Sequence, residues 1–261
     1  MTKYMKFSVI MSFYFQVMIL YYICRIFSYN IRKIIGFGVT TLNVKTDRFT
    51  DNEDLANAIS HLAGALLAIA ALVLMIIFSA VRGTAWHIVS CSVFGASMVF
   101  LYTSSTIAHW LPDGKAKDSF FAVDQAAIFI MIAGTYTPLS LVVLRGPLGW
   151  VLFGLEWGLA LFGIIRVTTR TNRFQTGVAL IDIVLYAGMG WIVVFLAGSV
   201  LKNMPVPGFI WIVAGGLFYT LGIIFYKVAR FRYHHLVWHL MVIAGSLCHF
   251  TAIFFYMILQ G

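Results

Sequence analysis

Seven long apolar segments constrain the fold of this chain more than any other feature of its sequence. Each is about long enough to cross a bilayer as a helix. They cover residues 57–81, 87–110, 121–144, 147–166, 178–200, 208–228 and 236–259. Short connections containing Gly, Pro or charged residues separate them. The sequence therefore predicts an all-α, polytopic membrane protein built as a seven-transmembrane helix bundle.

The composition agrees with a membrane location and bears on the partner. Hydrophobic residues make up 61% of the 261 residues and charged residues only 10%, which lies outside the range of soluble proteins. A net charge of +9 could suggest nucleic acid, but basic residues of membrane proteins usually lie in cytoplasmic loops and against anionic lipid. We therefore expect membrane lipid as the partner and exclude nucleic acid.

The first 49 residues form a separate N-terminal extension, and residues 50–261 form the membrane domain. The extension contains the apolar run "FSVIMSFYFQVMILYYICRIF", which carries Gln16 and has Arg25 near its end. This pattern fits an additional membrane helix, an interfacial helix or a leader. A leader would be uncleaved, because no small-residue cleavage site follows the run.

The distribution of Lys and Arg predicts the orientation of the bundle. Twelve basic residues fall on one side of the alternating loops and three on the other. The twelve are Arg32, Lys33, Lys45, Arg48, Lys115, Lys117, Arg166, Arg170, Arg173, Lys227, Arg230 and Arg232, and the three are Arg82, Arg145 and Lys202. The positive-inside rule places the first group in the cytoplasm and the C-terminus outside.

Ionisable residues from distant segments reach the same cytoplasmic depth in this topology. His109 closes the second segment in "STIAH", and Asp124 opens the third in "VDQAA". His235 and His239, in "YHHLVWHL", lie four apart at the start of the seventh and project from one helix face. Because ionisable groups are costly inside a membrane, this convergence indicates a functional site.

The residue types in this set suit a catalytic zinc site. Imidazoles from His109, His235 and His239 would leave Zn²⁺ one open tetrahedral position, and zinc lowers the pKa of water bound there towards about 7. Asp124 could act as general base on that water, and Ser105 could steady a substrate carbonyl or the water itself.

Other polar residues of the segments are interpreted as supporting or packing residues. Glu53, Asn57 and His61 follow one another at four-residue spacing, so they share a helix face that could support the metal ligands from behind. His87 and His249 are interpreted as helix-packing residues, because a lone histidine in a membrane helix usually hydrogen-bonds to a neighbouring helix.

Two acidic residues lie apart from this set, Glu156 near the middle of the fourth segment and Asp182 near the start of the fifth. An unpaired acid in hydrocarbon is costly, so both are expected to face the bundle interior. Asp182 could line a cavity beneath the metal, and Glu156 is expected to make a packing hydrogen bond.

Several ordered motifs resemble the bacterial hemolysin III family, which belongs with the progestin and adipoQ receptors. These motifs are "EDLANAISHLAGALL" at 53–67, "YTSSTIAHW" at 102–110, "VDQAAIFIMIAGTYTPLSLVVLRGPLGW" at 123–150, "GGLFYTLGIIFY" at 215–226 and "YHHLVWHLMVIAGSLCHFTAI" at 233–253. The resemblance covers about residues 50–259 and does not reach the N-terminal extension.

The resemblance implies a seven-helix bundle in the bacterial cell membrane with its amino end inside. Zn²⁺ would be held by His109 of the second helix and by His235 and His239 of the seventh. Asp124 would contact the metal water, and Ser105 matches the SxxxH pattern. Gln125 replaces the histidine that usually follows the family's aspartate, and Glu156 replaces an apolar residue.

Three functions remain open on the sequence. The resemblance of the eukaryotic relatives to ceramidases implies a zinc-dependent intramembrane hydrolase of lipid amides or esters. The family name implies a channel-forming cytolysin, although no amphipathic toxin segment and no cleavable export signal are evident. A sensor of membrane state, in which zinc links the helices without catalysis, is the third.

Overall fold

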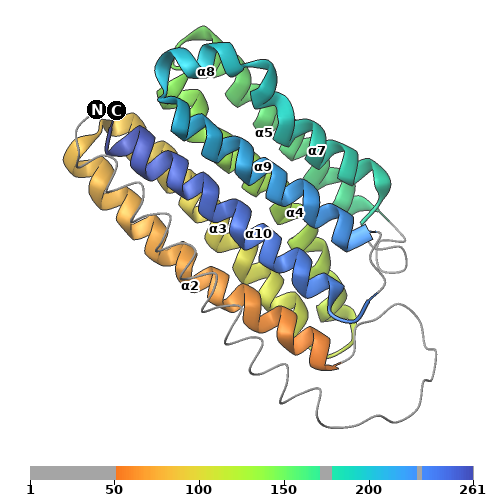
Figure 1. The fold of residues 1–261 in the computed structure, drawn as a ribbon. Coiled ribbons are helices and arrows are strands. Elements are labelled where there is room, and N and C mark those ends of the chain that lie inside the picture. The colour runs from red at the N-terminus through yellow and green to blue at the C-terminus, as the bar shows by residue number, and fades with distance from the viewer. Residues whose placement is uncertain (1–50, 171–177, 228–230, 261) are drawn as a thin grey trace. The chain divides into compact units, whose positions relative to one another are not determined.

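The computed structural model describes residues 51–170, 178–227 and 231–260 (Figure 1). In these ranges every regular element is a helix. The α-helices are α2 (Asp51–Arg82), α3 (Ala85–Trp110), α4 (Lys115–Pro138), α5 (Pro147–Thr169), α7 (Leu180–Phe195), α8 (Ala197–Asn203), α9 (Val206–Lys227) and α10 (His234–Ile253). Two π-helices, η1 (Leu139–Val143) and η2 (Phe254–Ile258), continue α4 and α10.

By its internal contacts the chain divides into two units, residues 1–52 and 53–261. The described residues belong almost entirely to the second unit. The expected N-terminal extension, residues 1–49, lies outside the described residues, so its proposed membrane helix and its boundary stay predictions.

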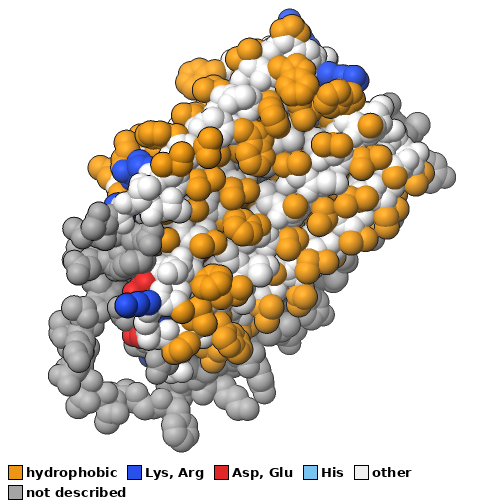
Figure 2. Space-filling model, turned by 180° about the vertical axis from the view of Figure 1, so that it is seen from behind, with side chains coloured by type: hydrophobic (Ala, Val, Ile, Leu, Met, Phe, Trp, Pro, Cys, Tyr) orange, Lys and Arg blue, Asp and Glu red, His pale blue; other side chains and the backbone are white. Residues whose placement is uncertain are grey.

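Most of the helices are long and apolar enough to cross a membrane. Six described helical spans meet this condition, and α7 with α8 makes a seventh if the bent pair is counted as one span. Outward side chains such as Leu66, Val151 and Phe195 are exposed, as a surface in contact with lipid requires. On the face drawn in Figure 2, hydrophobic side chains run along the bundle and charged ones gather towards its ends. The predicted all-α, polytopic membrane fold is confirmed.

The fifth predicted span, 178–200, is bent rather than straight. Its two helices, α7 and α8, meet at 58° around Leu196. Leu196 has a ψ of 7°, and its N–H donates to the carbonyl oxygens of Val193 and Val194. The turn tightens there, and α8 begins anew with hydrogen bonds from Ser199 and Val200 to the Leu196 carbonyl. No Pro lies at the bend, and the nearest signal in the sequence is the Gly198–Ser199 pair two residues later.

Pro138 ends the α-helical part of α4, and the chain continues directly as the π-helix η1. The N–H of Leu144 donates to the carbonyl of Leu139 at 2.9 Å, five residues earlier, which is the π pattern. Gly149 of α5 packs against the backbone of Ser140 in this segment, where a larger residue would overlap it. The helix therefore continues past Pro138 as a wider π-helical turn and does not break at the proline.

The helices α4 and α10 occupy the interior of the bundle. In the most apolar stretch of each span, 72% of the residues are buried in α4 with η1 and in α10 with η2, against 17% in α9 and 28% in α2 and in α5. Hydrogen bonds link α2 to α10, which lie beside each other in Figure 1. The helices α4 and α10 therefore provide the largest share of positions shielded from lipid.

The two isolated acids have different surroundings. Asp182 is fully buried and accepts hydrogen bonds from Nε and Nη2 of Arg166 at 2.8 and 2.5 Å, with Arg170 at 3.5 Å. This cluster joins α5 to α7. Glu156 is also fully buried, but neither of its carboxyl oxygens has a hydrogen-bond partner among the described residues. The structure therefore shows no packing hydrogen bond for Glu156.

Candidate metal centre

Three buried histidines converge at one end of the bundle. His109 lies at the end of α3, and His235 and His239 lie in the first two turns of α10. One ring nitrogen from each falls within 4.8 Å of the others. Bonds of ~2.0–2.1 Å to tetrahedral zinc place ligand atoms about 3.3 Å apart, so each imidazole would move inwards by at most about 1 Å. The group could therefore hold a metal ion.

The hydrogen bonds of His239 leave one of its ring nitrogens available as a ligand. Nδ1 lies 3.2 Å from the backbone oxygen of Asn57 and 3.1 Å from Oγ of Ser60. A carbonyl oxygen only accepts, so Nδ1 carries the proton and Nε2 keeps its lone pair. Nε2 is buried and has no hydrogen-bond partner in the described part of the chain. Its state is that of a metal-binding imidazole.

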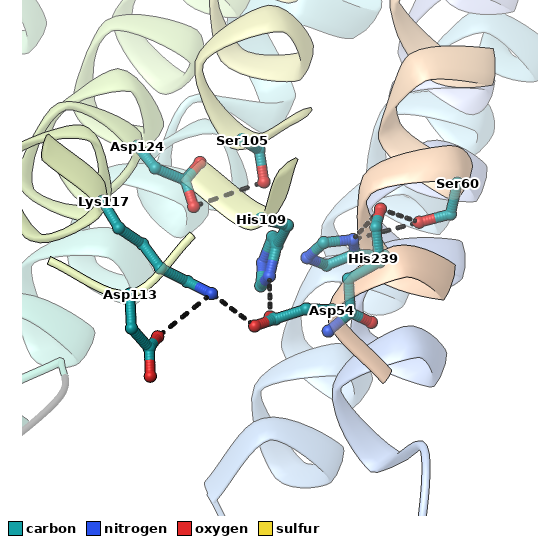
Figure 3. A network of polar contacts seen from close by, with 9 residues as sticks. Asp54, Ser60, Ser105, His109, Asp113, Lys117, Asp124 and His239 are labelled. Atoms are coloured by element: carbon teal, nitrogen blue, oxygen red, sulfur yellow. Dashed lines mark hydrogen bonds and ion pairs between the residues drawn. The ribbon is translucent and has the colours of Figure 1, made fainter. Parts of the chain in front are cut away.

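His109 is held by a chain of charged groups that begins on α2 (Figure 3). Its Nδ1 lies 2.8 Å from Oδ1 of Asp54, and Oδ2 of Asp54 accepts a hydrogen bond from Nζ of Lys117 at 2.5 Å. Lys117 also contacts the exposed Asp113 at 3.5 Å. A carboxylate on the nitrogen that does not bind metal is the usual support for a ligating histidine, because it fixes both the tautomer and the ring orientation.

Glu53 anchors the start of the helix that carries the other two histidines. Its Oε1 accepts a hydrogen bond of 2.9 Å from the N–H of Tyr233, the residue before α10. Tyr233 has a φ of 65°, in the left-handed region that non-glycine residues seldom adopt. This contact lies two residues before His235, so Glu53 ties α2 to the position at which α10 begins.

His61 and Asn57 lie behind His239. The rings of His61 and His239 stack with centroids 3.5 Å apart and an interplanar angle of 11°. Both ring nitrogens of His61 and both polar atoms of the Asn57 side chain are buried without a hydrogen-bond partner among the residues described. Asn57 thus contacts His239 through its backbone carbonyl, and His61 contacts His239 through the face of its ring.

Asp124 and Ser105 lie beside the three histidines rather than within their group. The Ser105 hydroxyl donates to Oδ2 of Asp124 at 3.3 Å, which links α3 to α4. Both side chains line one cavity together with His61 and His239. We call this space the site cavity. Asp124 thus lines the same cavity as His239 of the candidate metal group.

The site cavity extends from the histidines into the bundle. It measures about 900 Å³ between its walls, including the part open to the surroundings. Residues of α2, α3, α4, α7, α9 and α10 line it, and side chains such as Ile128, Ile132, Ile223 and Val242 give it an apolar wall. An apolar space with a few polar groups at one end is typical of small-molecule sites.

Sequence reasoning did not identify three of the supporting residues. Asp54 lies three residues before Asn57 and seven before His61, so the helical spacing that indicated Glu53 applies equally to it. Ser60 carries no comparable signal. Lys117 stands in the charged connection "LPDGKAKDS", which suggested a solvated loop and gave no sign of its burial.

Comparison with known proteins identifies the family of the chain. The family model described as haemolysin-III related matches residues 49–250. The Hemolysin-3 homolog of Bacillus subtilis (strain 168) is 41% identical over 208 residues, which are 80% of this chain and 96% of that protein. Hemolysin-3 of Bacillus cereus is 39% identical over 206 residues, covering 79% and 92%.

A more distant relative is human Monocyte to macrophage differentiation factor, 26% identical over 212 residues that cover 78% of this chain and 84% of that protein. No solved structure gives a significant match. The family match covers most of the chain and includes all three histidines of the metal group. The chain belongs to the haemolysin-III related family of multi-pass membrane proteins.

Proposed function

We propose that this protein is a zinc-dependent hydrolase that cleaves amide or ester bonds of lipids inside the membrane. The observation that carries the proposal is the position of the three-histidine group, because His239 lines the same cavity as Asp124 and Ser105. Three imidazoles beside a carboxylate resemble the donor sets of catalytic zinc sites, in which a fourth position stays open.

The residues divide the chemistry between them. Bound Zn²⁺ would supply Lewis acidity to the substrate carbonyl and lower the pKa of the attacking water. The Ser105 hydroxyl donates to Oδ2 of Asp124, and Oδ1 of Asp124 would accept a proton from that water. The carbonyl carbon gains the water oxygen, the C–N or C–O bond breaks, and the proton passes from Asp124 to the leaving amine or alcohol.

The cavity favours a lipid over a water-soluble substrate. Its wall is apolar, and it lies between helices that could cross a bilayer. An acyl chain would lie along this wall with its carbonyl at the histidine end.

The same proposal places the histidine end of the bundle on the cytoplasmic side of a bacterial cell membrane and the C-terminus outside. The excess of Lys and Arg in the loops at that end supports this orientation. A C-terminal alkaline phosphatase fusion should be active, and a C-terminal green fluorescent protein fusion should be dark. The opposite pair of results would reverse the orientation.

Purified protein in lipid vesicles tests the hydrolase directly. Ceramides and ester lipids are supplied as substrates, and fatty acid release and bound zinc are measured together. Asp124→Asn should keep its zinc and lose turnover, whereas His239→Ala should lose both. Asp113→Asn, which removes an exposed carboxylate, is the matched control and should retain both. Full turnover by Asp124→Asn would exclude this mechanism.

Two other functions give different results in the same preparation. A cytolytic channel, suggested by the name of the Bacillus cereus relative, would lyse erythrocytes whether or not Asp124 is replaced. A metal-linked sensor would bind zinc in both the unaltered protein and Asp124→Asn and would release no fatty acid from any lipid supplied.

A further inference from the structure

The site cavity shares part of its wall with a second cavity in the middle of the bundle. The second cavity extends towards η1 and η2, and four residues line both spaces: Thr135, Tyr136, Gly190 and His249. We call these four residues the neck. His249 follows His239 by ten residues of α10, which is about 15 Å at ~1.5 Å per residue. The neck therefore lies about half a hydrocarbon thickness of ~30 Å from the metal group.

His249 lines both cavities and carries one acceptor nitrogen. Its Nε2 lies 3.1 Å from the carbonyl oxygen of Ile212 on α9, so Nε2 carries the proton and Nδ1 keeps its lone pair. The Nε2 edge of the ring also lies close against Gly215 of α9, which turns Nδ1 away from that helix. His249 is 8% exposed, and Nδ1 has no hydrogen-bond partner within the described ranges.

The other polar side chains of the neck donate their protons to the backbone. The Thr135 hydroxyl donates to the carbonyl of Met131 at 2.8 Å. The Tyr136 hydroxyl donates to the carbonyl of Gly190 at 2.9 Å and accepts from the N–H of Val193. The neck therefore offers two acceptors, Nδ1 of His249 and the hydroxyl oxygen of Thr135. The donors of its side chains are already used in hydrogen bonds to the backbone.

We propose that the neck binds a hydroxyl group carried partway along the acyl chain of the lipid ligand. The placement of the chain's carbonyl at the histidines rests on the proposed function, and the hydroxyl site itself rests on the neck. A hydroxyl is neutral and donates a hydrogen bond, as the acceptors of the neck require. Carbonyls and carboxylates only accept, and an ammonium group would carry a charge into an apolar space at high cost.

Binding of three fatty acids tests this site without any need for turnover. Oleate has no hydroxyl, ricinoleate is the same chain with a hydroxyl near its middle, and α-hydroxyoleate carries the hydroxyl beside the carboxyl group. Each competes with a fluorescent fatty acid for the full-length, zinc-loaded protein in detergent micelles. The quantity compared between variants is the affinity for each hydroxy acid relative to oleate, so that partition into micelles cancels.

One hydrogen bond contributes about fivefold to this ratio. The ricinoleate-to-oleate ratio should fall about fivefold in His249→Leu, while the ratio for α-hydroxyoleate should stay constant. His249→Gln should keep most of the preference, because its amide can donate to the Ile212 carbonyl and still accept. His87→Leu makes the same substitution at a histidine outside both cavities and should change neither ratio.

Unchanged oleate affinity shows that a variant retains its fold. If His249→Leu no longer binds oleate, the test uses Thr135→Val instead. This variant should fold, because valine has the shape of threonine and the hydrogen bond that it removes lies within α4. The proposal predicts a lower ricinoleate ratio for Thr135→Val. An unchanged ricinoleate ratio in a folded His249→Leu, or in Thr135→Val where that variant decides, would overturn the proposal. A protein that binds ricinoleate selectively but hydrolyses no lipid would refute the hydrolase and leave this site intact.

Discussion

The carboxylate of Asp54 lies 2.8 Å from Nδ1 of His109, and this contact joins the first described helix to the end of the second. The second oxygen of Asp54 contacts Lys117 at 2.5 Å, so the carboxylate is held from both sides. A fixed carboxylate in turn fixes the imidazole, and the metal affinity of His109 then depends on a residue that does not touch the metal.

Asp54→Asn should weaken metal binding about 10–100-fold, because the amide supports the His109 ring less strongly than a carboxylate does. Competition for zinc against a chromogenic chelator measures this on purified protein. Asp113→Asn is the matched control, since the exposed Asp113 contacts the same Lys117, and it should bind zinc normally. Equal weakening in both variants would mean that local charge, rather than the contact with His109, sets the affinity.

Alanine at any of the three grouped histidines should abolish stoichiometric metal binding. Two imidazoles alone hold zinc far more weakly than three, because each ligand is part of one coordination shell. Metal content of purified His109→Ala, His235→Ala and His239→Ala should fall together, whereas His87→Ala, which lies outside the group, should keep its metal. A full equivalent of zinc in any of the three variants would contradict the assignment.

His61→Phe should retain metal binding and should not lower thermal stability. Phenylalanine keeps the stacking contact with His239 and removes two buried nitrogens that lack hydrogen-bond partners among the described residues. His61→Ala instead leaves a void behind His239 and should cost about 2 kcal/mol or more. Thermal unfolding in detergent compares the two. Loss of metal from His61→Phe would show that a ring nitrogen of His61 has a direct role.

Asp182→Leu should destabilise the bundle, because it leaves Arg166 and Arg170 without their shared counter-charge. Removing one partner of a fully buried ion pair lowers the free energy of unfolding by about 3–5 kcal/mol. The two arginines are partly exposed, so we expect a loss of about 2–3 kcal/mol here. The double variant Arg166→Leu/Asp182→Leu should recover part of this loss. Unfolding temperatures in detergent provide the measurement. A double variant less stable than Asp182→Leu would show that the arginine contributes mainly through packing.

Hydropathy and helical spacing were enough to predict the spans and the convergence of the histidines. A span of known length and orientation assigns each residue a depth, and the four-residue interval of His235 and His239 assigns a common face. Spacing could not choose between Glu53 and Asp54, which are adjacent and differ by about 100° around α2. The packing of α2 against α3 and α10 determines their partners: Glu53 accepts a hydrogen bond from Tyr233, and Asp54 contacts His109.

The bend in the fifth span and the neck depend on tertiary structure. The residues before Leu196 are apolar, and the only local signal near the break between α7 and α8 is the Gly198–Ser199 pair that follows it. His249 was interpreted as a packing residue, and its hydrogen bond to Ile212 agrees with that interpretation. That His249 also lines two cavities follows only from the arrangement of four helices.

The link between α2 and α10 has a consequence for biogenesis. Helices enter the membrane in the order of their synthesis, and α10 is the last one described, yet it supplies two of the three imidazoles and receives its anchor from Glu53. A nascent chain that has inserted only its earlier helices would carry His109 without its companions. The metal could then bind only after α10 has inserted and packed against α2. A cell short of the metal ion would accumulate protein whose helices are inserted but whose metal site is empty.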